Sequence, residues 1–598
     1  MDVDLQKRIN EAVVALGQLS AQPIDFNQMD PIAKMMLVAL VCESQKVQDY
    51  ADSAAERIVD RFCTDFIPRR NVEAMPAICL LKPDMNPSNT TAVVNIGSGA
   101  QFAYKTERHK APLNYIPLFN TMLLPHSGLY LLNRRVMREG INTIDIRMEK
   151  ENRAWVGIKT GAEINSMRGL SMLIRGTNGI TPEHIYVASN NQELDFSTMH
   201  EMENIEMAEP FDAQQSSGLF FSLIENWKEN LLNINDSTLL YITDEVTDRD
   251  LFKPRQFPRA FQQWLESDVL DYFSPSTIWL RLDFPEGYSV PDNFEVTLGV
   301  MPVTNIDVCS LMLTQAQPIA KLQQQEDAFF LRILETSTTA NSQGFNMTKD
   351  EIIVRDFDAV CYNNGDLYRD VRNLYNRFID DYYAFIEYNG IKDGEVLKQL
   401  RETINRLGKS VGQQNEAFKF DSGTYAMKNM NQYPPTSSTR VSFITTMGRI
   451  GNMPRAGETM ENKSDPAIEQ KVEILTSAMG GSDKATVDER YEQLRYFTLT
   501  NDRLYTRMDI DAFMRKELLA EFGKEEFRRI FVKMSIEGAG GYSKLQRGLY
   551  ITIEFKDTKN YDHARRVSLD NLLLQRIRNR SCIAMPINIL LRNLEEED

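Results

Sequence analysis

The sequence has few of the residues that build catalytic and metal centres. It contains five histidines and six cysteines in 598 residues, and no two cysteines stand in a C-x-x-C spacing. The His200–Glu201 pair lacks a second histidine one helical turn later, so it does not complete a zinc-binding helix. Scattered cysteines of this kind predict reduced, buried thiols in a cytosolic protein rather than a disulfide framework.

Motifs for nucleophiles and for phosphate binding are also missing. There is no G-x-S-x-G elbow, and the run Gly408-Lys409-Ser410 has Thr403 where a phosphate loop needs its first glycine. We therefore predict no catalytic residue, no cofactor and no metal, and we expect that the protein is not an enzyme. One alternative stays open, because the 84 acidic residues could include an unrecognised acid–base pair.

The chain also lacks an excess of basic residues and a long apolar run. Its 67 Lys and Arg against 84 Asp and Glu give a formal net charge of −17, which argues against binding to a nucleic-acid backbone. The apolar run at 35–42 is far shorter than the roughly 20 residues that span a bilayer. Acidic residues near the start replace the basic ones of a secretory signal. We expect a soluble chain with no nucleic-acid partner and no direct membrane insertion.

Apolar residues at helical spacing are what the sequence does contain. Two stretches in the first 68 residues repeat an apolar residue every three or four positions, and the second stretch starts at an Asp30-Pro31 helix signal. A third such stripe lies in 366–411 and is interrupted near residue 390, which predicts a helical hairpin. Because so few helices cannot form a large core alone, their stripes would pack either on partner helices or on this chain's next domain. The candidate partner-interface residues are Leu5, Ile9, Leu16, Met36, Leu40, Val47, Leu374, Phe378 and Tyr382.

Short β-like runs between turn signals occupy the middle of the chain, and the last hundred residues alternate strand and helix patterns. A strand at 493–500, a helix that begins with a Thr506–Asp509 capping box, two alternating strands, a helix and a final strand give the β-α-β-β-α-β order. The predicted fold class is α+β and multidomain. The expected units are an N-terminal helical segment (1–70), a first β-sandwich-like domain with insertions (71–250), a second β-rich domain (251–350), a helical hairpin (351–415), a loop or linker region (416–490) and a ferredoxin-like C-terminal domain (491–598).

One stretch, "VTLGVMPVTNIDV" at 296–308, breaks an apolar run with a proline and an asparagine. Since proline cannot donate to a strand ladder, we expect Pro302 to end strand pairing and Asn305 to turn or cap the chain. No acid, histidine or thiol of a catalytic arrangement accompanies them. The stretch therefore predicts a joint between domains rather than a site.

The longer segment 296–322 resembles a stretch in the TssF (VasA/ImpG) family, the baseplate wedge subunit of type VI secretion. There an apolar strand runs into Pro-Val-x-Asn and, some ten residues later, a Glu/Gln-Pro-Ile step. The segments 30–83 and 499–513 are similar to two further family stretches. Ile306-Asp307 replaces the Leu-Phe pair of many proteobacterial members, which favours a Bacteroidota-type branch. The signature positions are Pro68, Pro76, Pro302, Asn305, Pro318, Arg503, Thr506 and Asp509.

The resemblance implies a structural subunit of a contractile injection baseplate. Two copies of such a chain join one TssG-like subunit into a wedge, which engages TssK-like trimers and a TssE-like subunit around the spike hub and primes sheath and tube assembly. It also implies self-association through the C-terminal domain, and a cytoplasmic location docked at the inner membrane through the assembled baseplate. A wedge protein of a phage tail or of an extracellular contractile particle is the alternative in the same class.

Overall fold

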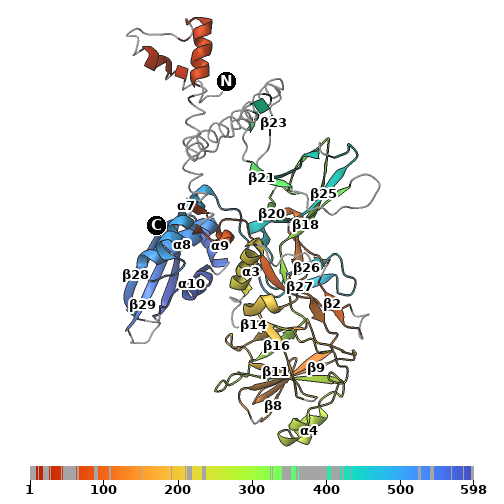
Figure 1. Ribbon diagram of the computed structural model, residues 1–598. Helices are drawn as coiled ribbons and strands as arrows, with labels where there is room; N and C mark the ends of the chain where they lie inside the picture. Colours follow the sequence, from red (N-terminus) through yellow and green to blue (C-terminus); the bar gives the residue numbers. More distant parts are fainter. Residues whose placement is uncertain are drawn as a thin grey trace, which may run out of the picture.

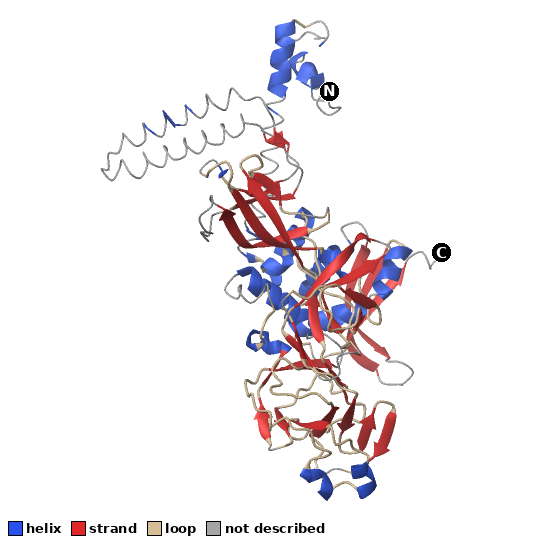
Figure 2. Ribbon diagram, turned by 90° about the vertical axis from the view of Figure 1, so that its right-hand side faces the viewer, coloured by secondary structure: helices blue, strands red, loops and turns tan. Residues whose placement is uncertain are grey.

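The protein is described from a computed structural model. It describes residues 9–17, 29–41, 62–339, 352–357, 361–362, 418–430 and 433–593, with short gaps inside these ranges, and residues 26, 44, 399, 402, 403 and 406. Figures 1 and 2 show a β-rich body with a C-terminal domain beside it and the N-terminal helices apart at one end. The mixed α+β, multidomain class expected from the sequence is confirmed.

A closed barrel forms the centre of the body. Its strand order is β1-β17-β4-β3-β26-β27, and its interior is filled by apolar side chains such as Leu81, Phe102 and Val303. These strands come from three distant parts of the chain. Their bounds are β1 (Ile78–Lys82), β17 (Met301–Thr304), β4 (His109–Pro117), β3 (Phe102–Thr106), β26 (Thr459–Asn462) and β27 (Lys471–Ile474).

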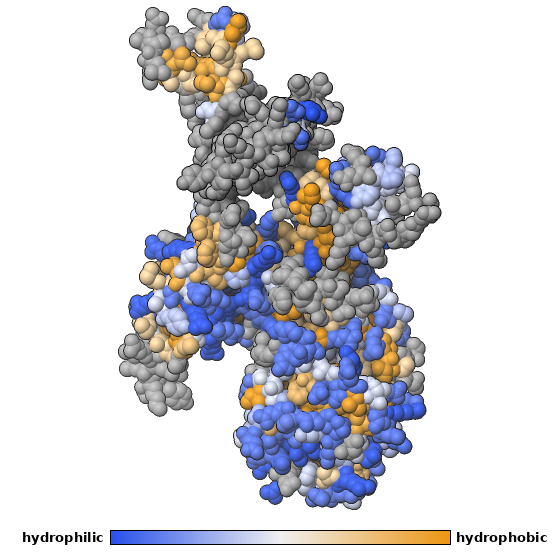
Figure 3. All heavy atoms as spheres, viewed as in Figure 1, coloured by the Kyte–Doolittle hydropathy of each residue, from blue (hydrophilic) through white to orange (hydrophobic). Residues whose placement is uncertain are grey.

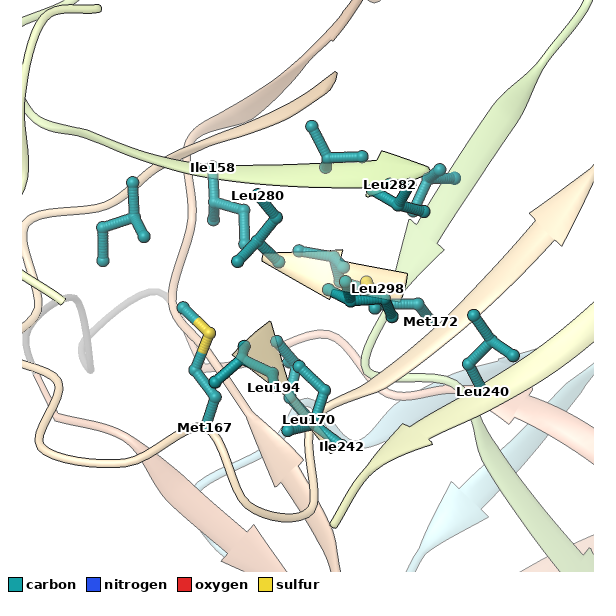
Figure 4. Packing of buried hydrophobic residues seen from close by; sticks show 14 of the residues in the cluster. Ile158, Met167, Leu170, Met172, Leu194, Leu240, Ile242, Leu280, Leu282 and Leu298 are labelled. Atoms are coloured by element: carbon teal, nitrogen blue, oxygen red, sulfur yellow. The ribbon is translucent and has the colours of Figure 1, made fainter. Parts of the chain in front are cut away.

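Two antiparallel sheets stand between β4 and β17 in the chain and pack face to face (Figure 4). Their shared core includes Ile158, Met172, Leu240 and Leu280. The seven-stranded sheet contains β12 (Gln192–Leu194), β11 (His184–Val187), β15 (Thr277–Asp283), β9 (Arg153–Lys159), β6 (Gly128–Leu132), β7 (Val136–Glu139) and β8 (Asn142–Asp145). The four-stranded sheet contains β13 (Phe196–Thr198), β14 (Ser237–Ile242), β10 (Ser171–Arg175) and β16 (Glu295–Leu298).

Helices cover the outer faces of both sheets. The helix α3 (Gly218–Leu231) places Trp227 in a core shared by the four-stranded sheet and the barrel. The short helices η5 (Arg259–Gln263) and α4 (Ser267–Asp271) close an aromatic cluster on the seven-stranded sheet. The remaining pieces near these sheets are η2 (Arg69–Asn71), β2 (Val94–Ile96), β5 (Thr121–Leu123) and η3 (Met199–Asn204).

Two small three-stranded sheets extend the body beyond the barrel, on the side toward the N-terminal helices in Figure 1. They share a core that includes Leu313, Ala426 and Phe443. The first sheet is β18 (Asp307–Thr314), β25 (Ser438–Thr446) and β20 (Phe329–Thr339), and the second is β19 (Ile319–Lys321), β24 (Gly423–Met427) and β21 (Ile353–Phe357). The pair β22 (Cys361–Tyr362) and β23 (Phe418–Lys419), and the turn η8 (Gly448–Asn452), complete this part.

The structure corrects two expectations about domain boundaries. The region 416–490, expected as a loop or linker, holds four strands of the barrel and the small sheets, β24 to β27. Three of these strands, β24, β26 and β27, have only four or five residues, and β27 follows the pattern exposed-buried-exposed-buried, so the region carries little apolar signal. The expected boundary at 250/251 also fails, because β15 and β16 complete sheets begun before residue 250.

The C-terminal domain corrects a third expectation. Residues 493–500, expected as a strand, are the second half of helix α7, which starts at a Thr486–Glu489 capping box. The sheet order is β28-β29-β30, antiparallel and then parallel, so the domain lacks the first strand of a ferredoxin-like fold. The elements are α7 (Val487–Thr500), α8 (Arg507–Phe522), β28 (Phe527–Gly538), β29 (Leu545–Phe555), α9 (Thr558–Arg566), α10 (Leu569–Arg580) and β30 (Ile587–Asn593).

Candidate partner interface

The N-terminal helices form a small pair with its own core. Residues 12–17 and 31–41 are helical, and Ile9, Val13, Leu37 and Val41 bury their side chains against one another, each at 7% exposure or less. Asp30 caps the second helix, since its carboxylate accepts a hydrogen bond from the Ile32 N–H at 2.8 Å. Ile9, expected at a partner interface, is therefore used inside this pair.

The other face of helix 31–41 leaves an apolar strip in solvent. Ile32, Met35, Met36 and Leu40 are 70%, 75%, 68% and 68% exposed. Their spacing of three, four and eight residues places them on one side of the helix. Figure 3 shows apolar residues gathered on this segment at the top of the molecule. Four large apolar side chains in a row on one helix are typical of a surface that another helix covers.

The strip contains part of the interface that the sequence predicts. Met36 and Leu40 lie in it, and Leu16 on the neighbouring helix is 38% exposed. Ile32 and Met35 of the strip are not among the candidates from the sequence, although a helical projection through Leu40 includes both. Of the other candidates, the following lie outside the described residues: Leu5, Val47, Leu374, Phe378 and Tyr382.

Residues 62–72 lead from the N-terminal segment into the body. Phe62 and Phe66 stack with ring centroids 5.7 Å apart, and both stay about half exposed. Pro68 precedes η2 with an extended backbone, which ends the helix before it. On the buried side, Cys63 and Ile67 pack against α7 through its Leu494 and Phe497.

Asn305 holds three distant segments together at the joint between β17 and β18. It is 2% exposed, and its backbone N–H donates to the Ala77 carbonyl at 2.8 Å. Its side-chain NH₂ donates to the Asn114 carbonyl at 2.8 Å, while its Oδ1 accepts from the Met447 N–H at 3.0 Å. The backbone and side chain of this one residue thus connect the start of β1, strand β4 and the end of β25, which makes this position structural.

The prolines of the signature have different roles. Pro302 lies inside β17, opposite Leu80 of β1, so the expectation that it ends strand pairing is wrong for that neighbour. On the other side, the ladder from β17 to β4 begins at Val303, where a donor is available again. The carbonyl of Pro76 faces the Asn226 amide at 3.5 Å, and that of Pro318 accepts from the Lys428 N–H at 3.1 Å.

The C-terminal signature residues form the start of α8. Thr506 Oγ1 accepts from the Asp509 N–H at 3.2 Å, and the Asp509 carboxylate accepts from the N–H groups of Thr506 and Tyr505 at 2.8 and 3.0 Å. Slight burial raises the pKa of Asp509, but these hydrogen bonds outweigh it and hold the pKa below its ordinary value. Arg503 lies just before this cap and lines a cavity at the edge of the domain.

The described residues offer little for catalysis. They contain no group of three or more His, Cys, Asp and Glu side chains that could hold a metal ion. Burial raises the pKa of Cys79 inside the barrel well above its ordinary value, and it raises the pKa of Cys309 to about 11. Both thiols therefore stay protonated at neutral pH. In a cavity of about 600 Å³ between the barrel and the paired sheets, Lys82 lies 3.8 Å from Asp84. Within the described part of the chain, no helix has the length and hydropathy needed to cross a membrane.

Comparisons with known proteins found a distant likeness among solved structures. No protein-family description matches the sequence, and no curated protein matches it. A chain in the cryo-electron microscopy structure of the type VI secretion system TssK-TssF-TssG baseplate subcomplex is similar to this one with a TM-score of 0.42 and 10% identity. The match covers 95% of this chain and 97% of that chain.

Proposed function

We propose that the protein is a structural subunit of the baseplate wedge of a type VI secretion or related contractile injection system, equivalent to TssF. The observation that carries the proposal is the apolar strip Ile32–Met35–Met36–Leu40, on a helical pair that stands apart from the body. The sequence resemblance to the TssF family, spread over both ends and the middle of the chain, supports the choice of this assembly. The partner of the strip would be an amphipathic helix of a TssG-like subunit.

The proposal extends to the rest of the baseplate. Two copies of this chain would join one TssG-like subunit, and the wedge would contact TssK-like trimers, a TssE-like subunit and the spike hub in the cytoplasm, docked at the inner membrane. The C-terminal domain would mediate contact between neighbouring copies. The signature residues would serve as structural positions, and no contact with nucleic acid is proposed.

The test is a pull-down of the tagged full-length chain from its native cells, with identification of the companions by mass spectrometry. Leu40→Asp should abolish recovery of the TssG-like subunit, because covering a charge with an apolar helix removes its hydration. Each apolar side chain of the strip contributes about 1.5–3 kcal/mol when fully buried, which corresponds to about 10- to 150-fold in affinity, and the desolvation of the Asp charge adds to that loss.

The matched control is Ile141→Asp. Ile141 is fully exposed at a turn of the seven-stranded sheet, far from the strip, so this variant should still recover the complex. Full recovery by folded Leu40→Asp would remove the strip from the interface. Membrane-complex genes beside this gene would indicate secretion, whereas capsid genes would indicate a phage tail.

An enzyme with an unrecognised carboxylate site has little support in the described residues. A general acid needs a raised pKa, which burial and neighbouring acids would produce. Here the carboxyl groups whose pKa departs from the ordinary value move down, because arginine, lysine or N–H partners stabilise their ionised forms against burial. These groups are Glu203, Glu229, Asp509 and Glu517.

A further inference from the structure

The junction between the body and the C-terminal domain contains a closed ring of four charged side chains. Arg70 lies 3.2 Å from Glu229, and Glu229 lies 2.6 Å from Arg580. Arg580 lies 2.9 Å from Asp502, and Asp502 lies 3.9 Å from Arg70, which closes the ring. Positive and negative charges therefore alternate, and each side chain contacts two of opposite sign.

Two of the four contacts cross from the body to the C-terminal domain. Arg70 in η2 and Glu229 in α3 belong to the body, since α3 shares the core of the barrel and the four-stranded sheet. Asp502 follows α7 and Arg580 ends α10, both in the C-terminal domain. The apolar core of that domain is built, in the described residues, from positions 496–591 alone. The ring is thus a link between two separate cores.

The ring is sheltered from water. The side chains of Arg580, Arg70, Glu229 and Asp502 are 11%, 19%, 22% and 31% exposed. Charges in such positions interact more strongly than exposed surface pairs, and removing one member leaves its partner poorly solvated. Tyr496 adds a hydrogen bond to Asp502 at 2.9 Å, so the ring is also fixed to α7.

In the described residues, the junction also has an apolar contact of Cys63 and Ile67 with α7. Arg449 of the body donates hydrogen bonds to the Ala520 and Glu521 carbonyls at the end of α8. A cavity of about 400 Å³ lies beside the ring. Ion pairs and hydrogen bonds thus make up much of the described junction, and domains joined by polar contacts are expected to move relative to each other.

We propose that the ring is an electrostatic latch, which sets the orientation of the C-terminal domain on the body and releases it without unfolding either part. The alternating order explains the fixed orientation. A rotation or slide that carried Arg580 toward Arg70 would bring Asp502 toward Glu229, so like charges would meet at both places. The latch stands on this geometry and does not depend on the proposed function.

The thiol of Cys63 reports opening of this junction. Cys63 is 1% exposed beneath α7, with its Sγ 3.7 Å from the Arg490 carbonyl oxygen. Cys79 is equally buried inside the barrel. Lifting the C-terminal domain exposes Cys63 alone, whereas unfolding of the body exposes both. Maleimide labelling of the full-length chain, followed at each cysteine by peptide mass spectrometry, separates the two events.

The test compares Glu229→Gln with Glu203→Gln. The first removes a ring charge. The second removes the 2.7 Å ion pair between Glu203 and Lys228, which lies within the body, and Lys228 is next to Glu229 in α3. Glu229→Gln should speed labelling of Cys63 about tenfold, the equivalent of about 1.4 kcal/mol, with Cys79 unchanged. Asp502→Asn, a change on the other side of the ring, should have the same effect, and Glu203→Gln should have none.

Salt gives an independent arm of the same experiment. At 1 M salt the screening length falls to about 3 Å, so labelling of Cys63 in the unaltered protein should rise, and rise less in Glu229→Gln. Unchanged labelling of Cys63 in both ring variants would overturn the latch. A parallel rise at Cys63 and Cys79 would also overturn it, because the ring would then stabilise the body rather than hold the domain.

Discussion

At the scale of single residues, Asn305 explains why a polar side chain interrupts an apolar run. Its buried side-chain amide bonds the backbone of Asn114 and Met447, and its own backbone N–H bonds Ala77. A buried amide that satisfies its neighbours is stabilising, and its removal leaves a carbonyl and an N–H without partners. The asparagine therefore specifies where β17 ends and β18 begins.

We predict that Asn305→Ala destabilises the body by about 2–4 kcal/mol, because the Asn114 carbonyl and the Met447 N–H lose their partner. The measurement is the midpoint of urea unfolding followed by tryptophan fluorescence. Asn142→Ala, an exposed position on the edge strand β8, is the control and should leave the midpoint unchanged. Equal midpoints for the two variants would show that the hydrogen bonds of Asn305 contribute nothing net.

At the scale of secondary-structure elements, local signals in the sequence predicted α8 but not α7. The helix α8 has a capping box and buries Ile510, Met514 and Leu518 at helical spacing. In α7 the buried positions include the polar Gln493 and Thr500, and the residues between them favour strands. The capping box at Thr486 and packing against the rest of the domain make this segment a helix. The apolar pattern alone does not distinguish a helix from a strand here.

The ionic latch gives a prediction about acid. Arginine partners outweigh burial and hold the pKa of Glu229 below its ordinary value of 4.5. The stabilisation that Glu229 gives the junction is therefore complete above pH 4.5 and is lost as the pH falls through the lowered pKa. The charged and titratable groups that face the latch are Arg70, Glu225, Tyr496, Asp502, Arg503, Arg576, Arg580 and, behind them, Lys516 and Glu517.

Labelling of Cys63 with a reagent that reacts at low pH should thus stay constant from pH 7 to 5 and increase below pH 4.5. Because the pKa of Glu229 is lowered in the folded state, Glu229 takes up a proton and weakens the junction only below pH 4.5. In Glu229→Gln the increase should be smaller, since one titrating member is gone. An increase that begins near pH 6 would instead indicate a histidine, and would contradict the assignment to Glu229.

At the scale of the whole molecule, the central barrel could not be predicted from the sequence. Its strands come from positions 78–117, 301–304 and 459–474, and they pair across hundreds of residues. Short strands with one buried face leave only weak local patterns, so the sequence predicts 459–474 as part of a linker. The exposed strip was partly predictable, because Met36 and Leu40 follow from helical spacing alone. The packing of Ile9 on Leu37 determines which face of the helix pair is exposed to solvent, and the sequence alone does not give this packing.

The arrangement of the parts suits a subunit that works through surfaces rather than through a pocket. The N-terminal pair, the body and the C-terminal domain present separate faces along one molecule (Figures 1 and 2). The strip would bind a partner helix at one end, and the latch would orient the domain at the junction. In the proposed role, the positions of these surfaces rather than the chemistry of a site would matter.

Native mass spectrometry of the complex purified on the tagged chain tests the central claim most directly. The account predicts a species with two copies of this chain and one TssG-like subunit, present in the unaltered protein and in Ile141→Asp but absent in Leu40→Asp. A chain that stays monomeric beside an expressed TssG-like subunit, or a complex that survives Leu40→Asp, would contradict it.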